Sequence, residues 1–151
     1  DASLFATHYE KPTQSTFRSA AGANDSFETG FKALENNNLP AAIDFFQSLP
    51  PNDARYAEAQ YWLGHAALQD KQYDRAIAAF QAVIGRDEVK FTEKAQWNLV
   101  LTYLAAGRTE EAGFQTSLTG IANNENHSFH QQALALQQKL NGFFRSNGLP
   151  Y

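Results

Sequence analysis

The chain of 151 residues contains neither cysteine nor methionine. Without cysteine it can form no disulfide, offers no thiolate nucleophile and supplies no cysteine ligand to zinc or an iron–sulfur cluster. A chain without cysteine is compatible with either side of a membrane, so the redox compartment stays open. Methionine is missing even at position 1, so we expect a processed or truncated product of a longer chain.

Long apolar runs and clustered positive charge are also missing. No window reaches the roughly 18 apolar residues of a membrane span, so we expect any membrane anchor to lie upstream of Asp1. The 12 Lys and Arg residues are scattered, and the net charge is −4. A nucleic-acid surface needs clustered cations that displace counterions from phosphates, so this pattern argues against a nucleic-acid partner.

Recognisable catalytic and metal motifs are absent as well. The sequence has no glycine-rich phosphate loop, no nucleophile elbow and no His-Glu-x-x-His motif, so we predict no catalytic residue, cofactor or small-molecule substrate. His127 and His130 share a helix face, as a metal pair requires, but no carboxylate joins them at helical spacing. We therefore predict that both are solvated surface residues. His65 stands alone on an apolar helix face, where either packing or ligand contact would explain it.

Helical spacing of apolar residues dominates from residue 25 onward, and no segment alternates with the period of a strand. The pattern predicts an all-α domain over 25–151. The expected helices span 25–37, 40–49, 53–70, 73–85, 91–106, 109–122 and 127–145. Pro40 suits the first turn of the second helix, and Gly107 suits the end of the fifth. Residues 1–24 lack this spacing and predict an extended or flexible arm, although Leu4, Phe5, Tyr9 and Phe17 give it apolar side chains.

The helical region repeats itself. The phrase EAQYWLGHAAL at 58–68 returns as KAQWNLVLTYL at 94–104. An offset of 34 residues relates Gly30 to Gly64, Ala42 to Ala76, Ile43 to Ile77 and Phe46 to Phe80. Ala112 follows Ala76 by 36 residues, which would place Val100 at the glycine position and Thr116 at the aromatic position of a third unit. A period near 34 with two helices per unit is typical of tetratricopeptide repeats.

The chain resembles the tetratricopeptide repeat (TPR) family over about residues 25–145. The resemblance implies a right-handed α-solenoid of three helix pairs, at about 25–52, 53–88 and 91–123, closed by a capping helix at about 127–145. The stretch AEAQYWLGHAALQDKQYDRAIAAF is similar to bacterial membrane-anchored envelope proteins of this family. That similarity implies the periplasm or another extracytoplasmic face of a bacterial membrane, and it leaves the cytoplasm open.

Large side chains recur on the first helix of each pair, which in this family lines the concave surface where partners bind. They are Phe27, Tyr61 and Trp97, followed one turn later by Phe31, His65 and Leu101. Spacing of four residues puts each pair on one helix face. We predict that the six form an aromatic-rich groove for a protein or peptide partner, with Tyr61 and Trp97 partly exposed. Packing into the core between repeats, or cover by residues 1–24, are the alternatives.

These observations favour a non-catalytic protein–protein interaction scaffold. The alternative is an envelope-assembly or cell-division accessory protein whose repeats are structural and whose N-terminal arm mediates oligomerisation. The occupant of the groove separates the two hypotheses. An open groove favours a partner, whereas a groove filled by residues 1–24 favours self-association or autoinhibition.

Overall fold

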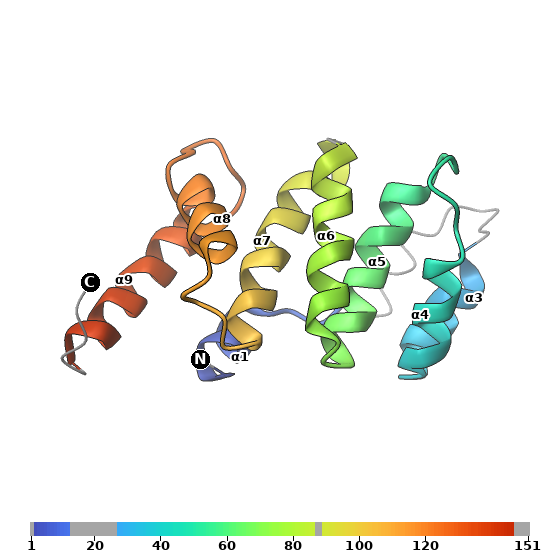
Figure 1. Ribbon diagram of the computed structural model, residues 1–151, viewed down its shortest axis with the longest axis horizontal. Helices are drawn as coiled ribbons and strands as arrows, with labels where there is room; N and C mark the ends of the chain where they lie inside the picture. The colour runs from blue at the N-terminus through green and yellow to red at the C-terminus, as the bar shows by residue number, and fades with distance from the viewer. Residues whose placement is uncertain (1, 13–26, 87–88, 147–151) are drawn as a thin grey trace.

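The computed structural model describes residues 2–12, 27–86 and 89–146, and within these ranges all regular structure is α-helical. The helices are α1 (Ala2–His8), α3 (Glu28–Glu35), α4 (Leu39–Gln47), α5 (Tyr56–Gln69), α6 (Tyr73–Arg86), α7 (Val89–Ala105), α8 (Ala112–Ala122) and α9 (His130–Ser146). Successive helices from α3 to α9 pack against one another in chain order (Figure 1). The predicted all-α solenoid of three helix pairs with a final helix over its end is therefore confirmed.

In each of the first two pairs, a glycine on the first helix faces a phenylalanine on the second and allows the two helices to pack closely. A Cβ atom added at Gly64 would lie 2.6 Å from the ring of Phe80, and one added at Gly30 would lie 2.6 Å from the ring of Phe46. Both rings are fully buried. The repeated glycine thus lets the two helices of a pair approach until the aromatic ring fills the space between them.

The first helix of every pair ends in the same backbone turn. Asn37, Lys71 and Gly107 adopt positive φ angles of 56°, 59° and 69°. At the middle position the amide of Lys71 donates to the carbonyl of Leu68, and the next amide donates to the carbonyl of Ala67. This paired closure satisfies the last carbonyls of the helix and reverses the chain. Only the third turn carries the glycine that marks such a site in a sequence.

The register predicted for α8 is wrong. Ala112 and Thr116, the expected counterparts of Ala76 and Phe80, are exposed. The buried face of α8 consists of Phe114, Leu118, Ile121 and Ala122. The connection before α8 covers 106–111, whereas the one before α6 covers only 70–72, so the offset of 36 residues does not extend into α8. Leu118 and Ile121 are buried on this helix, as Phe80 and Val83 are on the second helix of the second pair.

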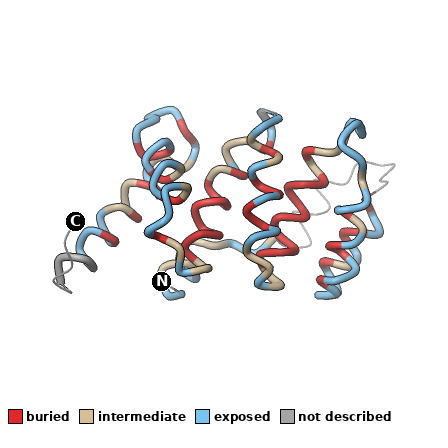
Figure 2. The backbone as a smooth tube through the Cα atoms, in the orientation of Figure 1, coloured by how far each residue is buried: buried red, intermediate tan, exposed pale blue. Residues whose placement is uncertain are grey.

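The arm predicted over 1–24 is also more structured at its start than expected, because α1 is a helix that packs beside α7. Leu4 and Phe5 on this helix, and Tyr9 directly after it, are half-buried and pack against the main core. Phe17 and the remainder of the predicted arm beyond residue 12 lie outside the described residues. Figure 2 shows α5 and α7 buried along most of their length, and α1 is one of the elements that cover them.

Candidate functional site

The six residues predicted to line the groove lie on α7, on α5 and on or just before α3, and all six are buried. Their exposed fractions are 1% for Phe27, 4% for Phe31, 8% for Tyr61, 2% for His65, 4% for Trp97 and 1% for Leu101. The prediction that Tyr61 and Trp97 are partly exposed is therefore wrong. The repeat spacing correctly placed the side chains on equivalent helices, but it did not show what covers them.

Part of this burial comes from packing between repeats. Phe31 meets the indole of Trp62 edge to face, with ring centroids 5.3 Å apart. Tyr61 lies 5.1 Å from the ring of Phe91 on the next first helix. These rings fill the junctions between neighbouring pairs, as aromatic side chains at helical spacing often do. Truncating them would cost fold stability, so they are poor probes of partner binding.

The remaining cover over this surface is the chain's own N-terminal segment. The hydroxyl of Tyr9 and Nδ1 of His65 share a hydrogen bond of 3.2 Å. The ring of His8 meets the indole of Trp97 edge to face, with centroids 6.0 Å apart. Figure 1 shows α1 at the lower end of α7, against which it packs. The concave surface of the second and third pairs is therefore occupied by α1 in this structure.

His65 is enclosed by aromatic rings. Its imidazole lies 4.7 Å from Tyr61, 5.6 Å from Phe80 and 6.0 Å from Tyr9, measured between ring centroids. Burial, with a smaller contribution from the positive charge of Lys94, lowers the pKa of His65 to about 3. The ring is therefore neutral at pH 7. Nε2 is buried and has no hydrogen-bond partner among the described residues.

This neutral histidine predicts a loss of stability in mild acid. The pKa of His65 is lowered from 6.5 to about 3 in the folded chain, so below pH 6.5 the unfolded chain binds a proton that the folded chain does not. The contribution of the neutral His65 ring to the free energy of unfolding is complete above pH 6.5 and is lost progressively as the pH falls toward 3. We expect a loss of about 2 kcal/mol from this residue between pH 7 and pH 5.

The measurement is urea unfolding of the parent and of His65→Gln at both pH values. Burial also lowers the pKa of His8 and of His127, so part of the parent's loss comes from those rings. The difference between parent and variant isolates His65. An equal loss in the two proteins would show that this imidazole is not protonated on unfolding in that range.

A hollow of about 490 Å³ remains beside α1, where the groove continues toward the first pair. Its walls include Phe5 and Tyr9 from the N-terminal segment and Leu39 and Leu68 from the repeats. Lys11 and Lys71 also border it, and Nζ of Lys11 donates to Oδ1 of Asn37 over 3.4 Å. The N-terminal segment therefore forms one wall of an opening whose other wall includes the start of α4 and the end of α5.

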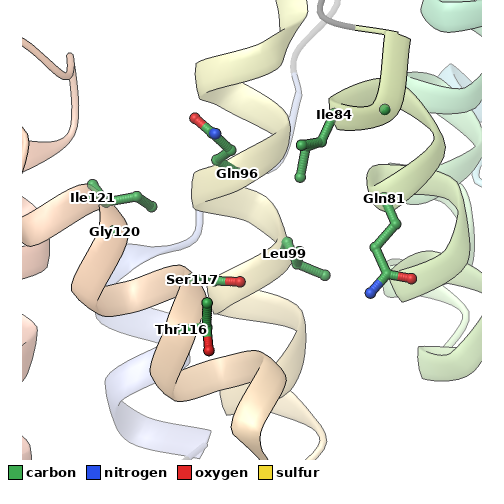
Figure 3. Close-up of a pocket in the computed structure, with 9 residues that line it drawn as sticks. Gln81, Ile84, Gln96, Leu99, Thr116, Ser117, Gly120 and Ile121 are labelled. Carbon is green, nitrogen blue, oxygen red and sulfur yellow. The ribbon is translucent and has the colours of Figure 1, made fainter.

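A second hollow, of about 450 Å³, opens between α6, α7 and α8 (Figure 3). Ile84 and Leu99 point into it from α6 and α7, and Thr116 and Ser117 line the side formed by α8. The residues that line it carry no charged, imidazole or phenol group, so they supply no acid or base. A similar hollow, of about 480 Å³, lies between α4, α5 and α6, where Ala78, Ala79 and Ala82 are the small residues of the second helix.

The prediction that His127 is a solvated surface residue is wrong. His127 is 7% exposed, and its Nε2 shares a hydrogen bond of 2.9 Å with Oε1 of Gln96. Its Nδ1 accepts a hydrogen bond from the amide of Phe129, whose ring stacks on Trp97 at 5.6 Å. His127 thus anchors the segment before α9 to α7. Within the described ranges no three His, Cys, Asp or Glu residues are grouped closely enough to hold a metal ion.

Tyr9 is the contact that sequence reasoning missed. Phe5 and Tyr9 are four residues apart and their rings stack with centroids 4.8 Å apart, so Tyr9, the residue after α1, continues the helix face that carries Phe5. That spacing was a usable signal for a short amphipathic helix. The sequence did not predict this helix, because α1 has only seven residues and is followed by a polar segment containing Pro12.

Comparison with known proteins agrees with this helical-repeat architecture. The tetratricopeptide repeat family model matches residues 33–90 and again residues 63–124, which together span more than half of the chain. The protein belongs to the tetratricopeptide repeat family, whose repeats serve generally as protein–protein interaction scaffolds. No curated protein and no solved structure matches the chain. In the part of the chain that the structure describes, no helix is both long and apolar enough to span a membrane.

Proposed function

We propose that the protein is a non-catalytic adaptor that binds a short partner helix on its concave surface, and that α1 occupies this surface until the partner displaces it. The observation that carries the proposal is the unequal burial of the two sides of the contact. The groove side consists of buried residues such as His65 and Trp97, whereas α1 has no buried residue of its own. A seven-residue helix is too short to be stable by itself in water, so its ordering depends on this contact.

α1 buries little apolar area on the concave surface, so a longer partner helix can displace it. Leu4, Phe5 and Tyr9 are only half-buried, so each contributes less than a core side chain would. A longer partner helix could bury more apolar area and could extend into the hollow beside Lys11 and Lys71. The surface uncovered on displacement is apolar and aromatic, which is the composition that supplies anchor contacts in protein interfaces.

The test uses the full chain with Phe5→Ala and Tyr9→Ala together, because these changes weaken α1 without altering the repeats. The probe is a fluorescently labelled peptide with the sequence of residues 2–12. We expect the double variant to bind the peptide measurably and the parent to bind it at least about ten-fold more weakly, because the parent's α1 competes at a high effective concentration. Circular dichroism melts check that the repeats remain folded.

Ser3→Ala is the matched control, because Ser3 is an exposed residue of the same helix. It is expected to behave as the parent does. Failure of the folded double variant to bind the peptide would contradict the proposal. A parent that forms dimers at rising concentration, and a double variant that stays monomeric, would instead assign α1 to oligomerisation, the alternative hypothesis.

A further inference from the structure

The hydrogen-bonding groups of the buried His65 ring restrict which segments can cover it. Its imidazole lies in a cage of aromatic rings and its exposed fraction is only 2%. In a neutral imidazole one nitrogen donates and the other accepts a hydrogen bond, whichever tautomer is present. Nε2 already lacks a partner among the described residues, and Nδ1 is satisfied by the hydroxyl of Tyr9.

An occupant without a hydrogen-bonding group at this point would leave both ring nitrogens buried and unpaired. An unpaired buried polar group costs more than a typical hydrogen bond contributes, because its hydration is lost without compensation. Sites that hydrogen-bond a hydroxyl group therefore reject analogues that lack it more strongly than apolar pockets reject a change of size. The covered His65 therefore favours an occupant that places a hydrogen-bonding group against its imidazole.

The second requirement is an aromatic ring one turn earlier on the same helix face. The ring of Phe5 stacks on the ring of Tyr9 with an interplanar angle of 17°, and both line the opening beside Leu68. This stack holds the phenol against the surface, so that its hydroxyl reaches Nδ1. Among the described residues, the titratable groups that act on His65 are the phenols of Tyr9 and Tyr61 and the ammonium group of Lys94, and none of these is a carboxylate.

We infer that the concave surface selects short helices that carry an aromatic residue followed four residues later by tyrosine, and that His65 determines this specificity by bonding to the tyrosine hydroxyl. The inference rests on the proposed function, since it describes the partner that replaces α1. The segment around α1 is then the internal copy of the recognised sequence. The chemistry specified is a neutral phenol on an amphipathic helix.

The experiment compares two peptides on one protein, the full chain with Phe5→Ala and Tyr9→Ala. One peptide has the sequence of residues 2–12, and the other is its Tyr9→Phe version, which removes a single oxygen atom. We expect the tyrosine peptide to bind about ten-fold more tightly, the size of effect expected when one buried hydrogen bond is lost. The ring nitrogen resonances of His65 should shift with the tyrosine peptide and remain nearly unchanged with the other.

Adding His65→Phe to the same chain tests the assignment to this residue. In that background the two peptides should bind within about two-fold of each other, because no imidazole remains to be left unpaired. If that variant does not fold, the nitrogen resonances in the His65 protein still decide the question. Equal binding of the two peptides to the His65 protein would overturn the inference and leave the proposed function standing. Binding of neither peptide would overturn the proposed function itself.

Discussion

Gly64→Leu is expected to destabilise the protein by about 3 kcal/mol or more, at the upper end of the cost of overpacking a core. A Cβ atom at this position would lie 2.6 to 2.8 Å from three atoms of the Phe80 ring. The ring is fully buried and is packed against the rings of Tyr61 and His65, so any shift would disturb the core. In a repeat array each unit stabilises its neighbours, so the loss should lower the melting temperature of the whole chain.

Gly120→Ala is the matched control for this prediction. Gly120 also lies within a helix, but nothing lies within 4 Å of a Cβ atom added there. Replacing a helical glycine by alanine without a clash should stabilise the chain by about 0.5–1 kcal/mol. Opposite signs for Gly64→Ala and Gly120→Ala in thermal melts would establish that close packing, not helix propensity, fixes the glycine. Ala76→Leu is expected to act in the same direction as Gly64→Leu, because Ala76 is fully buried.

Removing the chain after residue 125 is expected to make the protein associate more strongly than the full chain does. The buried residues of α9 include Ala133, Leu136 and Leu140. Leu140 borders the same small cavity as Phe114 and Leu118 of α8, so the truncation would expose that apolar face. A contiguous apolar patch of this kind drives association in water. Sizing chromatography and the yield of soluble protein are the measurements.

The truncation also removes the attachment of the preceding segment to α7. His127 would no longer bond to Gln96, and Trp97 would lose the stacked ring of Phe129. A chain that ends after residue 142 retains these contacts and Leu140, so we expect it to associate no more strongly than the full chain does. A monomeric, folded chain ending at residue 125 would show that α9 is a detachable element and not the cap of the array.

The architecture was predictable because its determinants are local and periodic. Alternation of small and large residues, as in Gly64 and Phe80, recurs at a fixed offset, and helical spacing assigns each segment to the same secondary structure. Two helices per period, stacked on their neighbours, leave one arrangement that buries the apolar faces. The same regularity placed Tyr61 and Trp97 correctly on equivalent first helices.

The properties that the sequence did not reveal depend on residues far apart in the chain. The longer connection 106–111 changed which face of α8 is buried, although the expected offset aligned Thr116 with Phe80. Exposure of the groove depends on a helix near residue 1 reaching α7, and periodicity within the repeats carries no information about that contact.

Hence the sequence by itself determined the helical-repeat fold and the equivalent helices on which Tyr61 and Trp97 lie. Only the tertiary structure decided that this surface is covered, that Tyr9 bonds to His65 and that His127 is an anchor. The physical reason is that helix formation and close packing between adjacent helices follow from neighbouring residues, whereas solvent exposure depends on every segment that reaches the same place.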